Sequence, residues 1–415
     1  MRYLPFALAF VLSVPSVSAQ APPRQTQQDD YTRYELLAPE TQSFRILYEV
    51  TATTPGARFY FNTIRPGSEA TDEQVWDMAT GAELKWEVVS GAQAQQEGHP
   101  AADAKTEYIK VHLARPVPDG GQARIRIDKT YKDPKSYFRD GDTIVFDRSL
   151  GIRRNSIVLP AGYRFEGINV PSQIRTEEDG RLMLSFQNPG PAAAPLVVRA
   201  VPGLPRFTPR PPSTTRGPSV PASLAAEAAR LDERAHQDRE IVYFLNDPAT
   251  HSFSLYHDYT ESRPGVDRYL NIVRGGSTVS NPSAISLDSG EALKVETLTG
   301  AAIAARGIDI GGAPAAETEV VVVSFPPVQP RQSIRLRITE TYTDTGRYRL
   351  DGDELVWDRA FGRPRNTVVL PAGWTVVASS IPGAVSMRAD GRQQIYFENA
   401  RNDDIQVLVR ARRVQ

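Results

Sequence analysis

Two copies of one polar motif are the first candidates for chemistry in this chain. Each copy has an Asp-Arg pair and, a few residues later, an Arg-Asn pair, and the copies are 211 residues apart. A carboxylate can act in acid–base catalysis, and a guanidinium can bind an anionic ligand. The motif therefore allows a polar binding site in each copy. Its residues are Asp147, Arg148, Arg154 and Asn155 in the first copy, and Asp358, Arg359, Arg365 and Asn366 in the second.

A structural role explains the same motif without a ligand. In this interpretation each Asp is partly buried, binds backbone amides in the turn after its strand, and is neutralised by a nearby Arg. Neighbouring residues on a strand face opposite ways, so Asp147 and Arg148 join one compact site only where the strand has ended. A structural device recurs in every copy of a domain, whereas an active site need not. We therefore favour the structural interpretation and expect Asp358 to stabilise its own domain.

A calcium site is a further hypothesis for this region, because calcium prefers clustered carboxylate oxygens. The spacing of the aspartates fits no calcium loop, however, and Asp-Gly between strands is already explained as a turn. The candidates are Asp133, Asp140 and Asp142, with partners Asp344, Asp351 and Asp353.

Other catalytic chemistry has little support in the sequence. The chain has no cysteine, and its five histidines show no zinc spacing. It has no nucleophile elbow and no phosphate-binding glycine loop, although a Ser-His-Asp triad built from distant positions would leave no local signal. The four tryptophans could form a sugar-stacking platform, but strand alternation favours core packing for Trp86 and Trp357. We expect no metal, no cofactor and no catalytic residues.

The polar motif lies inside a much longer repeat. Residues 140–162 recur as residues 351–373 at an offset of 211, and an earlier part of the chain repeats at an offset of 209. The change of offset places an insertion in the loop between Gly91 and Thr106, where it costs least. A repeat of this length indicates two copies of one domain.

The domain boundaries follow from the repeat and from local composition. We predict one domain over residues 31–203 and a second over residues 240–414. Residues 204–239 are predicted to form a proline-rich linker followed by one amphipathic helix. Residues 20–30 are polar and predict a disordered leader. Residues 1–19 have the charge, apolar run and small-residue cleavage site of a secretory signal peptide.

A signal peptide predicts a secreted or periplasmic protein of a bacterium. After its removal, no stretch of the chain is long and apolar enough to span a bilayer. The formal net charge of −1 gives no electrostatic attraction to nucleic acid or to an anionic membrane. Without cysteine there are no disulfides, so each domain depends on its hydrophobic core.

Short alternating strands and frequent turn signals set the fold class. Arg124–Tyr131 and Ala82–Val88 alternate apolar and polar residues, and Asp140-Gly141 and Asp179-Gly180 are typical of hairpin turns. Helical patterns are not found within either copy. The sequence therefore predicts an all-β protein with two homologous antiparallel β-sandwich domains, joined by a proline-rich linker and one helix.

Several short stretches resemble a known type of domain. They are Tyr34–Leu37, Phe44–Val50, Asp77–Trp86, Leu159–Gly162 and Val170-Pro171. Together they resemble the accessory β-sandwich that precedes the catalytic domain in secreted zinc aminopeptidases and glycyl aminopeptidases. The zinc-binding helix motif of those enzymes is not found in this sequence. The chain more closely resembles uncharacterised exported bacterial proteins with tandem sandwich domains, a likeness that implies no activity.

These observations favour an exported, non-catalytic binding or scaffolding protein of the bacterial cell envelope, with a protein or a glycan as partner. Edge strands are a plausible contact, and Glu319–Ser324 is a candidate, although so apolar a run also fits a buried central strand. The alternative is a hydrolase whose site is built on the loops of one sandwich. An enzyme should show one copy with a polar cleft that the other copy lacks.

Overall fold

The structure is a computed structural model that describes residues 25, 31–188, 192–203, 238–399 and 404–414. The expected signal peptide and the proline-rich linker with most of its helix lie outside the described residues. Gln25, within the expected leader, is described and is hydrogen-bonded to the first domain. Its amide nitrogen donates to the carbonyl of Phe61 at 3.1 Å, and the Phe61 amide donates to its Oε1 at 2.9 Å.

Over its described residues, the first domain contains fourteen strands and two short helices. They are β1 (Tyr31–Leu36), η1 (Pro39–Thr41), β2 (Ser43–Ala52), β3 (Phe59–Thr63), β4 (Glu69–Asp77), β5 (Trp86–Ser90), α1 (Gly91–Gln96), β6 (Glu107–His112), β7 (Ala123–Lys132), β8 (Tyr137–Asp140), β9 (Thr143–Leu150), β10 (Arg154–Val158), β11 (Tyr163–Ile168), β12 (Gln173–Thr176), β13 (Leu182–Gln187) and β14 (Ala194–Pro202).

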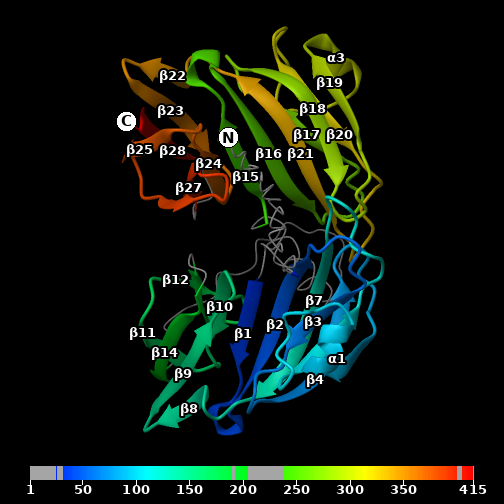
Figure 1. The fold of residues 1–415 in the computed structure, drawn as a ribbon, viewed down its shortest axis with the longest axis vertical. Helices are drawn as coiled ribbons and strands as arrows, with labels where there is room; N and C mark the ends of the chain where they lie inside the picture. The colour runs from blue at the N-terminus through cyan, green and yellow to red at the C-terminus, as the bar shows by residue number, and fades with distance from the viewer. Residues whose placement is uncertain (1–24, 26–30, 189–191, 204–237, 400–403, 415) are drawn as a thin grey trace, which may run out of the picture.

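The second domain repeats this order element by element. Figure 1 shows the two domains one above the other. Its elements are β15 (Glu240–Leu245), η2 (Pro248–Thr250), β16 (Ser252–Glu261), β17 (Arg268–Ile272), β18 (Thr278–Ser286), β19 (Lys294–Thr299), α3 (Ala301–Ala305), β20 (Glu319–Ser324), β21 (Ile334–Thr343), β22 (Tyr348–Asp351), β23 (Glu354–Phe361), β24 (Arg365–Val369), β25 (Trp374–Ser379), β26 (Ala384–Met387), β27 (Gln393–Glu398) and β28 (Ile405–Arg413).

Each domain has a seven-stranded, a four-stranded and a three-stranded sheet, and no described sheet mixes strands of the two halves. The seven-stranded sheet of the first domain has the order β12-β13-β10-β1-β2-β7-β4, and that of the second has the matching order β26-β27-β24-β15-β16-β21-β18. The pairing is antiparallel except between β1 and β10, and between the equivalent β15 and β24. The predicted fold class, two homologous β-sandwich domains, is confirmed.

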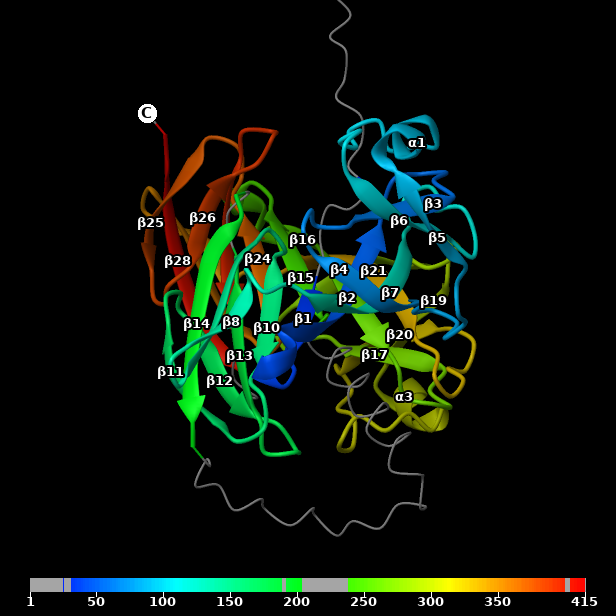
Figure 2. The same cartoon turned by 90° about the horizontal axis from the view of Figure 1, so that it is seen from below.

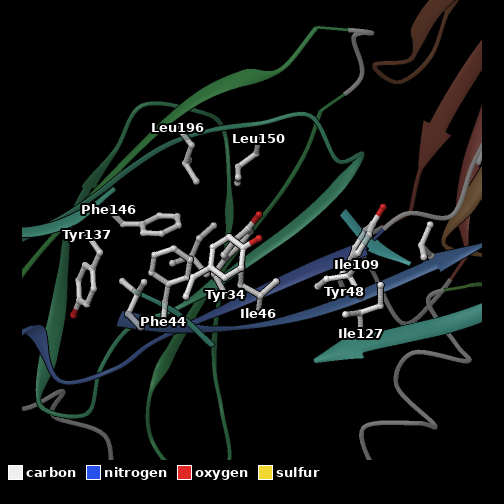
Figure 3. Packing of buried hydrophobic residues seen from close by; sticks show 14 of the residues in the cluster. Tyr34, Phe44, Ile46, Tyr48, Ile109, Ile127, Tyr137, Phe146, Leu150 and Leu196 are labelled. Carbon is white, nitrogen blue, oxygen red and sulfur yellow. The ribbon is translucent and has the colours of Figure 1, made fainter. Parts of the chain in front are cut away.

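Strand alternation builds the core of each sandwich. Along β2, Phe44, Ile46, Tyr48 and Val50 are buried and face the opposing sheet, as the close view in Figure 3 shows for the first three. Phe44 meets Phe146 of β9 edge to face, with ring centroids 5.3 Å apart. In the second domain the equivalent pair is Phe253 and Trp357, at 4.6 Å. Two aromatic cores thus stabilise a chain that has no disulfide.

The structure corrects two expectations drawn from the sequence. Glu319–Ser324 forms β20, the central and buried strand of its sheet, so it is not an edge available for docking. The offset between the copies also changes twice: β6 and β20 are 212 residues apart, while β7 and β21 are 211 apart. In the second copy, the loop between β19 and β20 is three residues longer than its equivalent between β5 and β6. The loop between β20 and β21 is then one residue shorter than its equivalent between β6 and β7.

The two domains meet in a reciprocal contact. The backbone amide of Gln122 in the first domain donates to Leu287 O of the second at 2.8 Å. The equivalent residue of the second domain, Ser333, donates its hydroxyl to Met78 O of the first, also at 2.8 Å. Because Met78 and Leu287 are themselves equivalent, the same two segments contact each other in both directions. This pattern is that of a two-fold, isologous interface.

Two equivalent glycines allow the close approach at this junction. Gly81 and Gly290 both have positive φ, at 70° and 76°. A Cβ on Gly81 would lie 2.6 Å from Arg331 O, and one on Gly290 would lie 2.9 Å from Pro118 Cβ. Each glycine thus faces a segment of the other domain, and a side chain would separate the two domains at either position.

Candidate functional site

The structure does not bring the eight residues of the polar motif into one site. Asp147 and Asp358 lie on β9 and β23, and both side chains are exposed. Their backbone amides donate to Ser136 O and Arg347 O, each at 2.8 Å. The expectation that the Asp358 carboxylate is partly buried in a turn is therefore wrong, because the strand continues through this position and its alternation turns the side chain to solvent.

Arg148 and Arg359 face the other way and are buried inside their domains. The Arg148 guanidinium lies 5.4 Å from the centre of the Phe44 ring, and Arg359 lies 5.1 Å from that of Phe253. Alternation therefore separates each Asp from its neighbouring Arg, as expected if the strand does not end between them. A guanidinium between aromatic faces is stabilised by cation–π interaction.

The acidic partners of these arginines are Asp133 and Asp344, which had been considered as calcium ligands. Arg148 Nη1 lies 2.9 Å from Asp133 Oδ2, and Arg359 Nη1 lies 3.7 Å from Asp344 Oδ2. Asp133 Oδ1 also accepts the Ser136 amide at 3.1 Å. Burial alone would raise the pKa of Asp133, but the Ser136 hydroxyl and the Arg148 charge hold it below its ordinary value. The structural role expected of Asp147 belongs to Asp133.

Arg154 and Arg365, in contrast, meet at the domain junction. Both guanidine Nη atoms of Arg154 donate to Asp238 Oδ1, at 3.1 and 3.2 Å. Arg365 Nη2 donates to the carbonyl of the same residue at 3.1 Å, and Arg335 Nη1 does so at 3.4 Å. Equivalent arginines of the two domains therefore converge on one residue that precedes β15. Their role is to hold the two domains and this segment together.

Asn155 and Asn366 complete the motif and are both structural. The side-chain amide of Asn155 donates to Ile152 O at 2.8 Å, and that of Asn366 donates to Arg363 O at 2.7 Å. Each bond closes the turn that leads into β10 or β24. Both side chains are buried.

A second ion pair lies at the junction and was not predicted from the sequence. Arg124 binds Asp288 through two bonds, from Nε to Oδ1 at 2.8 Å and from Nη2 to Oδ2 at 2.9 Å. Both side chains are 7% exposed. Arg124 has an equivalent in Arg335, but the position equivalent to Asp288 holds Ala79, so the pair exists once. This mismatch between the copies was the only sequence signal for it.

One buried position carries opposite charges in the two domains. Lys129 lies in the first core, where its ammonium donates to Asn62 Oδ1, and burial lowers its pKa to about 7. Its equivalent is Glu340, whose pKa burial raises, and which accepts two bonds from Asn271 Nδ2 at 2.9 and 2.8 Å. Perturbed pKa values often mark active sites. Here both groups lie inside the sandwich, each hydrogen-bonded to the equivalent asparagine, and burial is the main cause of both shifts.

Candidate metal ligands are not gathered either. Among the described residues, no group of three or more His, Asp or Glu side chains is placed to hold a metal ion. His257 is buried against Tyr269, whose hydroxyl lies 3.2 Å from His257 Nδ1. Burial, followed by the charge of Arg363, lowers the pKa of His257 well below its ordinary value.

A polar hollow of about 260 Å³ lies on the three-stranded sheet of the second domain. Its charged lining includes Glu296 and Arg306, which are paired at 2.8 Å, and its floor includes Val322. In the first domain the residue equivalent to Val322 is Lys110. The Lys110 ammonium lies 3.0 Å from Glu87 Oε1 and 4.3 Å from the Phe59 ring centre, and so occupies the corresponding space. The position that has a short apolar side chain in the second domain therefore has a long charged one in the first.

The seven-stranded sheets have one protected edge and one unprotected edge. At the protected edges, β4 and β18 contain bulges around Asp72 and Asn281, which have positive φ of 58° and 50°. The other edges are β12 and β26, which pair without a bulge. Bulges blunt an edge against further strands, so β12 and β26 are the better templates for another strand.

Exposed apolar side chains lie on these two unprotected edges. Ile174 of β12 is 55% exposed, and Val385 and Met387 of β26 are 50% and 64% exposed. Ile174 is paired with Leu184, and Val385 with Ile395, which are both core residues. Directly opposed residues lie on the same face of a sheet. The exposed side chains therefore continue the core outward to the rim of each sandwich.

Among known proteins, the chain is similar only to solved structures. No family model and no curated protein sequence matches the chain. An M1 zinc metallopeptidase from Deinococcus radiodurans is 13% identical, with a TM-score of 0.29, over 43% of this chain and 42% of that chain. An aminopeptidase N family protein from Idiomarina loihiensis is 11% identical, with a TM-score of 0.26, over 41% of this chain and 29% of that chain.

These matches agree with the resemblance seen in the sequence, at low identity and partial coverage. The chain covers less than half the length of either enzyme. TM-scores at this level carry no argument about activity.

Proposed function

We propose that the protein is an exported, non-catalytic binding protein of the bacterial cell envelope, and that β12 and β26 bind an extended segment of a partner protein. The observation that supports this proposal is the pair of equivalent sheet edges with half-exposed aliphatic side chains. An edge strand offers unpaired backbone N–H and C=O groups, and main-chain hydrogen bonds give affinity when a peptide strand is added.

The side chains on these edges define what the partner segment must look like. A strand added beside β26 would place alternate residues on the core face, next to Val385 and Met387. Apolar residues at those positions would cover the exposed aliphatic groups. This burial would contribute about 25 cal/mol of favourable binding free energy per Å² of apolar area removed from water. The partner should therefore alternate apolar and polar residues over four to six positions, roughly the length of the edge.

The domain junction helps this function by fixing the two edges relative to each other. Figure 2 shows β12 and β26 on the same side of the molecule. The ion pair between Arg124 and Asp288 and the reciprocal hydrogen bonds of Gln122 and Ser333 hold the two domains together. A partner with two suitable segments would bind the second edge at high effective concentration. Export, expected from the signal peptide, would bring the protein to envelope partners.

The test uses hydrogen exchange on the purified mature protein with a synthetic peptide of alternating valine and threonine. Slower exchange at residues 173–176 and 384–387 is expected. The Val385→Lys, Met387→Lys double variant should lose the slowing at 384–387 and keep it at 173–176. Val88→Lys is the matched control, because Val88 is 49% exposed on β5, a strand of another sheet. Unchanged exchange at both edges contradicts the proposal. Binding of envelope glycan in place of peptide would replace it with a carbohydrate-binding function.

The hydrolase alternative is favoured by a single observation, the open polar hollow near Glu296 in the second domain. Panels of peptide, ester, glycan and phosphate substrates test this alternative. Turnover that Glu296→Gln abolishes, while the folded state remains intact by melting, would refute the non-catalytic proposal. Turnover that no point substitution removes would indicate a contaminant.

A further inference from the structure

A second hollow, of about 300 Å³, lies between the two domains. The first domain contributes Ala79 and Arg115 to its lining, and the second contributes Asp288, the Pro326–Val328 segment and Gln332 among others. Ala79 and Asp288 are equivalent residues of the two copies, so the hollow spans the two-fold junction. Clefts between domains are preferred places for small ligands.

The copies differ in their contribution to this hollow. Backbone bonds align the segments: Val117 O accepts from Gly56, and Val328 O accepts from Gly265, each at 2.8 Å. With this alignment, Ala114-Arg115 of the first copy stands where the second copy has the single residue Pro326. The one-residue change of offset described above therefore lies at the hollow. It gives the site a guanidinium from one domain and a proline wall from the other.

The charges around the hollow leave Arg115 as the group that would bind an anion. The Asp288 carboxylate already accepts bonds from Arg124 Nε and Nη2, and from the backbone amide of Arg335 at 2.8 Å. Its charge is therefore compensated. Arg115 Nε donates to Asp288 O at 2.6 Å, which fixes the guanidinium in place. Its nearest carboxylate is Asp77, with Nη1 at 4.0 Å from Oδ2, and that carboxylate accepts the amides of Ala79 and Thr80.

We propose that this hollow binds a small organic carboxylate with an apolar body. The carboxylate is bound by the outer edge of the Arg115 guanidinium, and the apolar body packs on Pro326, Pro327 and Val328. A guanidinium recognises a carboxylate through two parallel hydrogen bonds, and prolines give a rigid apolar wall. The volume suits a ligand of about ten to fifteen non-hydrogen atoms. This site is separate from the edge strands proposed for the partner protein.

Binding at this place would also strengthen the contact between the domains. The ligand would contact both domains only when they are docked, and a ligand that binds one state stabilises that state. A bound carboxylate should therefore raise the unfolding midpoint of the docked two-domain protein without altering either edge strand.

The experiment titrates the full mature protein with benzoate and with N-acetylphenylalanine, followed by calorimetry and by chemical shifts. Benzamide is the neutral control ligand of the same shape. Saturable binding of the carboxylates is expected, with roughly tenfold weaker binding of benzamide. Arg115→Gln should weaken carboxylate binding by a similar factor, and Arg115→Lys by less. Arg306→Gln, which alters the hollow of the second domain, should leave this binding unchanged.

A second variant keeps the test decisive if Arg115→Gln disturbs the junction. Gln332→Trp would fill the hollow while Arg115 stays in place, and should abolish binding with the melting midpoint retained. Carboxylate binding that survives Gln332→Trp, equal binding of benzamide, or no binding by the wild-type protein would each overturn the proposal. Because the edge strands are untouched, these outcomes are independent of peptide binding at β12 and β26.

Discussion

The cores of the two domains share one fold but solve the same buried polar position with opposite charges. Lys129 in the first domain and Glu340 in the second both lie between the sheets, 5% and 2% exposed. The residue they share is an asparagine, Asn62 or Asn271. A side-chain amide can accept a bond from a lysine or donate bonds to a carboxylate, so it serves either charge. What the fold requires at this position is a satisfied hydrogen bond, and the sign of the charge is free to change.

The surface shows the same freedom at a second place. In the first domain, Glu97 pairs with Lys110. In the second domain, Arg306 takes the place of Glu97 and pairs with Glu296, while Val322 takes the place of Lys110. The exchange leaves a paired charge on each sheet, and it replaces a long side chain of the first domain with a short one at the hollow of the second. Neighbouring positions have thus changed together between the two copies, and the change alters the surface at this place.

The largest expected effect breaks the asymmetry of the junction. Arg124→Ala leaves Asp288 buried without its guanidinium, which should destabilise the docked protein by about 3 kcal/mol or more. Denaturant unfolding with native-state hydrogen exchange measures the loss for each domain. Arg199→Ala, an exposed arginine paired with Asp140, is the control and should change little. An effect of equal size in both variants would show that the junction does not depend on this ion pair.

The next effect tests the shared asparagine. Asn62→Ala and Asn271→Ala should each destabilise their own domain by about 2 kcal/mol, because each removes a hydrogen bond to a buried charged group. Hydrogen exchange resolved by domain is the measurement. Asn246→Ala, which removes a partly buried bond to the neutral Ser252 hydroxyl, provides a milder comparison. Destabilisation by only one of the two core variants would contradict the equivalence of the positions.

The pH dependence sharpens the comparison further. The pKa of Lys129 falls from 10.5 to about 7 on folding. Between these values the unfolded chain binds more protons, so the stability of the first domain should rise with pH, by at most about 1.4 kcal/mol per unit. The pKa of Glu340 is raised above 4.5, so the folded state binds more protons and the second domain should lose stability as pH rises through that region. Lys129→Met and Glu340→Gln should remove the respective slopes.

Unfolding followed separately in each domain across this pH range checks the prediction. Slopes of the same sign in both domains would contradict it. So would slopes that survive the two substitutions, because the titrating groups would then be others.

The smallest expected effect concerns the polar motif. Asp358→Ala should change stability by less than about 0.5 kcal/mol, because the carboxylate is exposed. Asp344→Ala should cost several times more, because it leaves Arg359 without its acidic partner in the core. Melting midpoints of the two variants provide the test. Equal losses of stability in the two variants would contradict the assignment of a structural role to Asp344 alone.

Much of the fold was predictable because it depends on local patterns. Alternation such as that of β7, and the Asp-Gly turns with positive φ at Gly141 and Gly352, can be recognised within a few residues. The repeat then gave the second domain from the first. The parallel pairing of β1 with β10 was not predictable, since it joins segments more than a hundred residues apart.

The site was harder to predict, because its partners come from distant segments. Nothing near Arg148 in the sequence singles out Asp133 as its acidic partner, and the adjacent Asp147 was the more obvious choice. The contact of Arg124 with Asp288 links the two domains, so no pattern within one domain could reveal it. Alternation identified which side chains face inward, but only the three-dimensional arrangement shows what they meet there.

The reciprocal junction has a consequence for assembly. A surface that pairs with its own equivalent is fully buried once the two copies meet. The contact therefore forms a closed pair and cannot propagate into a chain of molecules. Joining the copies in one polypeptide also makes the contact independent of protein concentration, since dilution cannot separate the halves. The duplication thus behaves as a dimer that is present from synthesis, with Gly81 and Gly290 as positions where an added methyl group would clash with the other domain.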